Sequence, residues 1–131
     1  MSGYVVDHLA LIAGLSGAGT EQQRREMSRL LDGAAVGGPT LDLPALCLSA
    51  ASSSRSGIAE HVADLIASAR NGAIAVSGLT RTAYLDALVA LRPNLGWPAT
   101  HAAARALATG QPIFTALPEQ YFGVGLNVMP L

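Results

Sequence analysis

The stretch Tyr4-Val5-Val6-Asp7-His8-Leu9-Ala10-Leu11 sets the pattern from which the fold is predicted. It begins with a short apolar run of the β type, and the residues after Asp7 are expected to form a short helix that ends near Leu15. Similar apolar runs predict strands over residues 73–76, 112–115 and 126–129, with helical segments between them. Short, wholly apolar strands that alternate with helices are typical of a parallel sheet covered on both faces. We therefore expect an α/β fold, a three-layer α/β/α sandwich with a central, mainly parallel sheet.

Capping residues and hydrophobic spacing predict the other helices. Thr20 and Gln23 have the spacing of a capping box, and Gly33 is expected to end the helix that they begin. Residues 34–40 are expected to form a glycine-rich loop, and Pro44 suits the first turn of the next helix. Further helices are predicted over residues 56–69, 80–93 and 98–109, and the strand at 73–76 is expected to be buried.

The length favours one domain that covers residues 1–131. The composition favours association of this domain with another chain. Half of the residues are hydrophobic and only 13% are charged, against about 25% in an average soluble protein. So few charges predict an apolar face that is buried against a partner or a second copy, with residues 9–15 and 27–31 as the expected contributors. The net charge of −1 gives no general attraction to nucleic acid, so any RNA binding would have to be local.

The single cysteine and the chain start restrict the class further. Cys47 is the only cysteine, which excludes an internal disulfide and a cysteine-based metal site. No basic region precedes the first apolar run, as a signal peptide would require. The longest uncharged stretches contain Gly and Pro and are shorter than the ~20 residues of a membrane span. These features predict a cytoplasmic protein without a membrane partner.

A glycine-rich segment, Gly14-Leu15-Ser16-Gly17-Ala18-Gly19-Thr20, superficially suggests a phosphate-binding loop. A Walker loop needs Lys before its Ser or Thr, and Gly19 occupies that place. The segment also follows a predicted helix rather than a strand. We therefore interpret it as a flexible connector.

The histidines and arginines allow both structural and functional readings. No histidine has metal-type spacing to another His, Asp or Glu; His61 is interpreted as a surface residue, and His101 opens an alanine-rich helix near the expected strand ends. Arg24, Arg25 and Arg29 form a small basic patch that can hold phosphates or acidic partner residues. Glu21 and Glu26 at salt-bridge spacing favour a solvated face instead.

Three segments, in order along the chain, carry a family resemblance. They are Tyr4-Val5-Val6-Asp7-x-x-Ala10-Leu11, the run from Leu43 to Ala50 that contains Pro44, and the run from His101 to Tyr121. Together they resemble PIN-domain ribonucleases. In that family the first strand delivers an Asp, a helix begun by Pro carries a second acid, and an Ala-rich helix leads to a strand ending in Thr-x-Asp, then Pro and Tyr. The resemblance implies a central parallel sheet and an acidic pocket for Mg²⁺ or Mn²⁺ at the strand ends.

The chain departs from that family at most of the acidic positions. Asp7 matches the first acid, whereas Ala50 and Leu117 fall where the second and fourth are expected, and residues 96–100 contain no acid in place of the third. A pair of divalent ions needs several carboxylates, so Asp7 is expected to be a vestigial catalytic residue and at most a weak metal ligand. It can equally cap the following helix. The pocket is predicted from these and nearby residues: Ala50, Thr100, His101, Thr115, Leu117 and Glu119.

The preferred hypothesis is a degenerate PIN-like domain with little or no nuclease activity that acts as a protein- or RNA-binding module. We expect it to be the toxin-like half of a toxin–antitoxin-type pair, which forms a homodimer or binds a small antitoxin-like protein. No cofactor is expected. One alternative is an active endoribonuclease dependent on Mg²⁺ or Mn²⁺, in which Glu60, Asp86 or Glu119 compensates for the missing acids. A second alternative is a small-molecule or nucleotide binder at the strand-end pocket.

Overall fold

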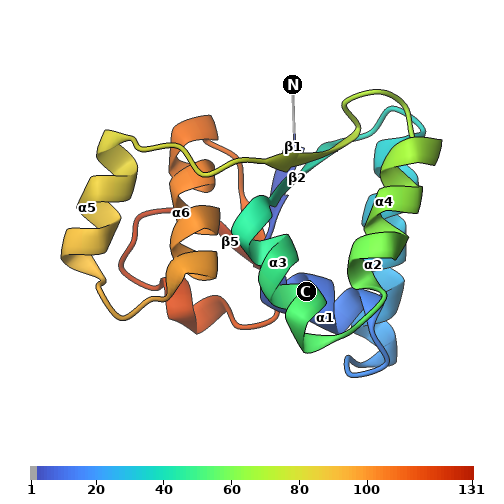
Figure 1. The fold of residues 1–131 in the computed structure, drawn as a ribbon, viewed down its shortest axis with the longest axis horizontal. Coiled ribbons are helices and arrows are strands. Elements are labelled where there is room, and N and C mark those ends of the chain that lie inside the picture. The colour runs from blue at the N-terminus through green and yellow to red at the C-terminus, as the bar shows by residue number, and fades with distance from the viewer. Residues whose placement is uncertain (1–2) are drawn as a thin grey trace.

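The computed structural model describes residues 3–131, which form a five-stranded sheet flanked by helices (Figure 1). The elements in chain order are β1 (Gly3–Val6), α1 (His8–Leu15), α2 (Glu21–Ala35), β2 (Thr40–Pro44), α3 (Ala45–Ser54), α4 (Ile58–Ser68), β3 (Ile74–Ser77), α5 (Ala83–Leu91), α6 (Trp97–Thr109), β4 (Ile113–Thr115), the 3₁₀ helix η1 (Pro118–Tyr121) and β5 (Val128–Pro130).

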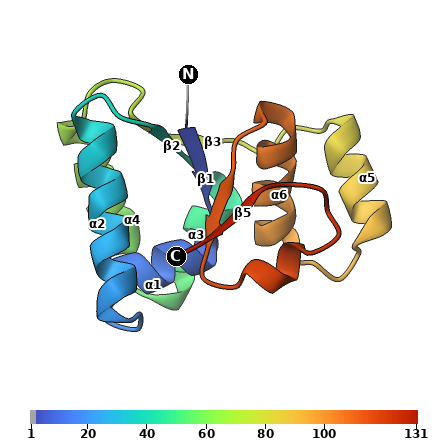
Figure 2. The ribbon, with the colours of Figure 1, turned by 180° about the vertical axis from the view of Figure 1, so that it is seen from behind.

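The sheet has the strand order β3-β2-β1-β4-β5, and every neighbouring pair is parallel. Helices α5 and α6 lie on one side of the sheet, and α2 and α4 lie on the other (Figures 1 and 2). Helices α1 and α3 directly follow β1 and β2, so they lie near the carboxyl ends of the strands. The α/β class predicted from the sequence, a three-layer sandwich, is confirmed.

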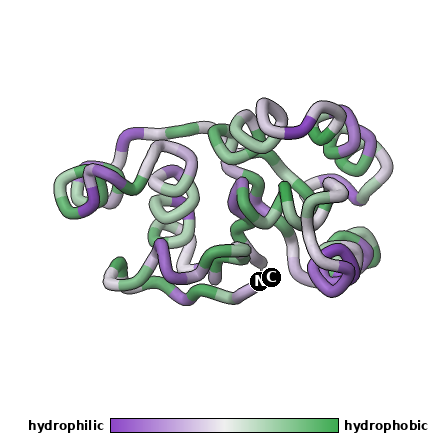
Figure 3. The backbone as a smooth tube through the Cα atoms, turned by 90° about the horizontal axis from the view of Figure 1, so that it is seen from below, coloured by the Kyte–Doolittle hydropathy of each residue, from purple (hydrophilic) through white to green (hydrophobic). Residues whose placement is uncertain are grey.

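Two hydrophobic clusters fill the space on either side of the sheet. Because successive strand residues point to opposite faces, Val5 and Ile113 pack with α6, whereas Val6 and Phe114 pack with α1 and α2. The α6 side is built largely from small residues, among them the fully buried Ala102 and Ala103, which lets the helix lie close to the sheet. Hydrophilic residues are densest along α2 (Figure 3).

Several local predictions are wrong in informative ways. The sequence does not predict β2, since Asp42 and Pro44 interrupt its apolar pattern. Helix α2 continues through Gly33 to Ala35, because the chain reverses only at Gly37, whose φ is 97°. Helix α5 is capped by Thr82, whose side chain accepts a hydrogen bond from the Leu85 amide, so it begins after residue 80.

Strand β3 was expected to be buried, but Ala75 and Val76 are exposed. The reason is its place in the sheet: β3 lies at an edge, and α5, the next helix, packs against α6. The glycine-rich connector is also less free than expected, because a Cβ at Gly19 would lie 1.9 Å from the Ala13 carbonyl oxygen.

The helices expected to form a partner surface are largely turned inward. Leu11 of α1 and both Met27 and Leu30 of α2 are buried in one core cluster, because the two helices pack on each other and on the sheet. Their apolar side chains therefore do not form the exposed face that was predicted. Over residues 3–131, none of the helices has the length and apolar composition to cross a membrane.

Candidate functional site

Asp7 lies at the carboxyl end of β1 and caps the first turn of α1. Its Oδ1 accepts a hydrogen bond from the Ala10 amide at 2.9 Å, as an N-cap side chain does. Its Oδ2 accepts hydrogen bonds from the Tyr121 hydroxyl at 2.7 Å and from the Gln120 side-chain amide at 3.2 Å. The residue is fully buried. Both carboxylate oxygens are thus occupied by groups of the chain itself.

Burial controls the electrostatics around this carboxylate. Desolvation raises the pKa of Asp7 above its ordinary value, and hydrogen bonds from Thr115, Tyr121 and the Ala10 amide only partly oppose it. The pKa of Tyr121 is raised by burial and by the adjacent Asp7. The pKa of His8, next in the chain, is lowered because burial disfavours its charged form. The surroundings of Asp7 therefore favour neutral groups.

Cys47 lies beside this network on α3. It is fully buried, and its thiol donates a hydrogen bond to the Pro98 carbonyl at 3.0 Å. Burial, with the Asp7 charge nearby, raises the pKa of the thiol. A thiol with a raised pKa is a poor nucleophile and metal ligand, so Cys47 joins α3 to the first turn of α6 as a packing residue.

The other positions of the predicted pocket are distributed as follows. Leu117 follows β4, the parallel neighbour of β1, so it lies at the same end of the sheet as Asp7, and 41% of its surface is exposed. Its amide donates to the buried Thr115 hydroxyl at 3.1 Å. Ala50 lies on α3 one turn beyond Cys47 and is half-buried, while Glu119 is exposed on η1.

Thr100 and His101 lie together on α6 but face different surroundings. Thr100 is buried and lines a cavity of about 90 Å³ with Val89, Arg92 and Trp97. His101 is buried, its Nδ1 accepts a hydrogen bond from the Leu46 amide at 3.3 Å, and burial lowers its pKa. Its Nε2 has no hydrogen-bond partner among residues 3–131. The structure therefore draws Asp7, Thr115 and Leu117 together, whereas Thr100 lines a separate cavity.

The acids considered as replacements are exposed and lie on different elements. Glu60 is on α4, Glu119 is on η1, and Asp86 on α5 pairs with Arg81 at 3.3 Å. Within the described range, no group of three or more His, Cys, Asp or Glu side chains is placed to share a metal ion.

A polar cluster on the α6 side of the sheet has no counterpart in the sequence predictions. Asp42 of β2 accepts hydrogen bonds from the Ser77 hydroxyl at 2.5 Å and from the Arg105 guanidinium at 2.8 Å. In the chain, Ser77 is 35 positions and Arg105 is 63 positions from Asp42. The pairing of β2 with β3 brings Ser77 to Asp42, and the packing of α6 on β2 brings Arg105 there. Likewise, Tyr121 and Gln120 are more than 110 positions from their partner Asp7.

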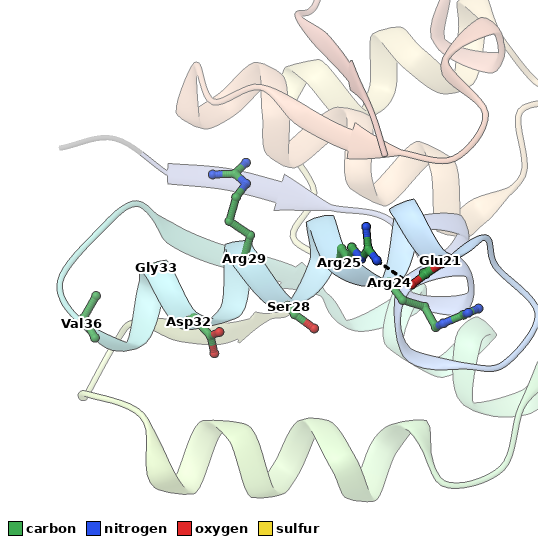
Figure 4. Close-up of a pocket in the computed structure, with 8 residues that line it drawn as sticks. All are labelled: Glu21, Arg24, Arg25, Ser28, Arg29, Asp32, Gly33 and Val36. Carbon is green, nitrogen blue, oxygen red and sulfur yellow. Dashed lines mark hydrogen bonds and ion pairs between the residues drawn. The ribbon is translucent and has the colours of Figure 1, made fainter.

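The arginine patch of α2 borders a surface hollow of about 920 Å³ (Figure 4). Arg25 pairs with Glu21 at 2.7 Å and Arg29 pairs with Glu26. Arg24 donates to the Gly19 carbonyl, and Asp32 adds a further negative charge along the same helix. These contacts favour the reading of a solvated, charge-balanced face over a phosphate site.

No protein-family model matches the chain, and a search of curated proteins finds no relative with significant similarity.

Proposed function

We propose that the chain is a degenerate PIN-like domain that acts by binding, with little or no nuclease activity. Its partner is a second copy or a small antitoxin-like protein, or an RNA that it holds without cutting, and its compartment is the cytoplasm. The parallel sheet with helices on both faces is compatible with the architecture that the family resemblance implies.

The burial and the hydrogen bonds of Asp7 are the main support for this proposal. A two-metal nuclease needs carboxylates whose oxygens are open to the ions and whose negative charges offset the repulsion between them. Asp7 is fully buried, and both of its oxygens accept hydrogen bonds from the chain. The positions that correspond to the other family acids hold Ala50, Leu117 and the acid-free run 96–100. The arrangement favours a structural carboxyl over a metal ligand.

Exposed apolar side chains near the same end of the fold support a binding role. Trp97 at the start of α6 is 56% exposed and Phe122 after η1 is 67% exposed. Arg92 donates to the Phe122 and Gln120 carbonyls at 2.9 and 2.8 Å, which holds the end of α5 against η1. Large exposed aromatic residues on an ordered surface are typical of protein interfaces. A protein partner is therefore favoured over RNA, because the arginines of α2 are already engaged.

A titration with Mn²⁺, paired with an RNA cleavage assay, tests the absence of metal-dependent nuclease activity. Both are run on the wild type and on Asp7→Asn, which keeps a capping oxygen but loses the charge. We expect weak Mn²⁺ binding and no metal-dependent cleavage in either protein. Cleavage by the wild type that disappears in Asp7→Asn would mean that other acids rebuild the site, and would establish the nuclease alternative instead.

A complementary experiment tests the binding surface. The double variant Trp97→Ser/Phe122→Ser should lose capture of a partner from a lysate of the source cells, because it removes the two most exposed aromatic side chains at this end. Tyr84→Ser, on the exposed face of α5, is the matched control and should retain capture. Equal capture by all three proteins would show that this surface is not the binding site.

A further inference from the structure

The sheet has two open edges, and the chain protects them differently. Strand β5 is three residues long and contains Pro130, which cannot donate a backbone hydrogen bond. Strand β3, at the other edge, has no proline, and the ten residues from Asn71 to Thr80 carry no charge. Natural edge strands are usually guarded by charged residues or Pro, because an unguarded edge is a template for another strand. Strand β5 therefore has a residue that hinders pairing with a further strand, whereas β3 has neither a proline nor a charged residue.

The free hydrogen-bonding groups of β3 can be assigned from its pairing with β2. The Leu41 amide of β2 donates to the Ala73 carbonyl at 2.9 Å, so the backbone groups of residue 73 are turned toward β2. Because these groups alternate in direction along a strand, those of Ala75 and Ser77 also face β2. The N–H and C=O groups of Ile74 and Val76 therefore face outward from the sheet.

The surroundings of β3 leave this edge accessible. Val76 is 43% exposed, and Ala75 is exposed on the opposite face of the strand. Helix α5 packs against α6, away from the edge (Figure 2). Leu79, just beyond the strand, is also exposed. Helix α5 therefore does not cover this edge, and the residues at its centre are exposed on both faces of the strand.

We propose that β3 pairs with β3 of a second copy of this chain, antiparallel and centred on Ala75, so that the two five-stranded sheets become continuous. In this register Ile74 of each copy lies opposite Val76 of the other, and their outward groups exchange roughly four hydrogen bonds. The two Ala75 residues face each other at the closely spaced, non-hydrogen-bonded position, where small side chains fit. The pairing also covers Val76. This inference rests on the proposed function where that names a second copy as the partner, and it assigns the contact to β3; it uses neither Asp7 nor the aromatic surface.

The pattern of charge favours a second copy as the occupant. A two-fold arrangement places an uncharged segment beside an identical one. Pairing therefore buries no charged side chain and places no two like charges opposite each other within the strands. The nearest like charges, Arg70 and Arg81 of the two copies, lie beyond the strand ends, and Arg81 is paired with Asp86 at 3.3 Å. A four-residue strand buries less area than a permanent dimer requires. We therefore expect a reversible dimer with a dissociation constant on the order of 100 μM.

Val76→Pro tests the pairing without touching the β2–β3 ladder, because the Val76 amide points away from β2. Proline removes that donor and should weaken dimerisation by at least about tenfold in sedimentation equilibrium. Val76→Thr is the matched control: it keeps the amide and the β-branched shape, and should dimerise like the wild type. Both variants are checked for native folding by far-ultraviolet circular dichroism. A wild-type chain that stays monomeric to near-millimolar concentration, or a dimer unaffected by Val76→Pro, overturns the proposal.

A cysteine scan tests the register. In a Cys47→Ala background, Ala75→Cys places two thiols on directly opposite residues, whose Cβ atoms are about 5 Å apart and so near the separation that a disulfide spans. Mild oxidation should link the chains. Leu79→Cys is exposed but lies far from its own copy in this register, and should not cross-link. Cross-linking at residue 79 and not at residue 75 overturns the assigned register. Neither result depends on nuclease activity or on the aromatic surface.

Discussion

The Asp7 carboxylate joins two segments that are 114 residues apart. It caps α1 through the Ala10 amide and accepts a hydrogen bond from Tyr121 on η1, so it fixes both the start of a helix and the position of the segment after β4. The sequence predicted Asp7 at a strand end and left a helix cap and a ligand role equally open. The cap is observed. The Tyr121 contact was not predictable from the sequence, because it depends on β1 and β4 being neighbours.

Replacing Asp7 by Ala should lower the free energy of unfolding by about 3 kcal/mol. Roughly 1 kcal/mol comes from the lost cap, and the rest comes from the Tyr121 hydroxyl, which stays buried without its partner. Thr82→Ala is the matched control, since Thr82 caps α5 through the Leu85 amide without a second contact of this kind. It should cost about 1 kcal/mol. Urea unfolding measures both, and equal losses would show that the Tyr121 contact contributes nothing.

The raised pKa of Asp7 predicts how its contribution to stability changes with pH. An unfolded Asp7 ionises near pH 3.8, whereas the folded carboxyl keeps its proton to higher pH because it is buried. Its contribution is therefore complete below pH 3.8 and declines as pH rises through the folded pKa. The stability of the wild type relative to Asp7→Asn should be greatest near about pH 4 and should shrink toward about pH 7. A difference that grows with pH in urea unfolding would mean that the folded pKa is lowered.

At the level of elements, sequence patterns located most helices and strands but did not assign their surroundings. The start of the helix at Thr20, the helix that ends at Gly110 and the strand at residues 113–115 lie where they were predicted. Strand β2 was missed because its own residues include Asp42, whose charge is offset by Arg105 from a distant helix. Strand β3 was located but placed in the interior, because a short apolar run does not reveal which strand lies at a sheet edge.

The α1–α2 connector offers a pair of glycine substitutions with opposite expected effects. Gly19→Ala should destabilise the fold by at least about 2 kcal/mol, because the new Cβ would meet the backbone of Ala13 in α1. Gly17 has open space around its Cβ direction, so Gly17→Ala should be neutral or stabilise by about 0.5 kcal/mol through the unfolded chain. Thermal unfolding distinguishes them. Similar melting temperatures for the two variants would support the flexible connector expected from the sequence.

At the scale of the whole molecule, the fold class followed from the alternation of strands and helices, whereas motif positions alone do not specify which side chains meet. The parallel pairing of β1 with β4 brings the ends of the chain together, so Asp7 and Leu117 lie at one end of the sheet. Thr100, predicted for the same pocket, instead lines a cavity of about 90 Å³. Small-molecule sites occupy about 300–1,000 Å³, so this cavity gives little support to the ligand-binding alternative. The size of this cavity depends on the side-chain packing between α5 and α6, which the spacing of residues in the sequence does not predict.

Restoring acids at this end of the sheet tests whether charge alone separates this chain from a metal site. The double variant Ala50→Glu/Leu117→Asp adds two carboxylates, and Leu117 is exposed enough for its replacement to reach solvent. Mn²⁺ affinity measured by calorimetry should rise by about tenfold or more over the wild type, because each carboxylate offsets part of the ion's charge. RNA cleavage should stay absent, since no acid is restored between residues 96 and 100.

The matched control for this experiment places the same two charges elsewhere. Ala67→Glu and Ala108→Asp lie at exposed positions in the last turns of α4 and α6. These helices lead into the amino ends of β3 and β4, so the variant adds equal charge at the end of the sheet away from Asp7 and Leu117. That variant should bind Mn²⁺ like the wild type. If both double variants gain affinity equally, the gain reflects net charge and the strand ends are not a vestigial site. If the restored variant also cuts RNA, two acids with Asp7 are sufficient and the requirement for a third carboxylate is wrong.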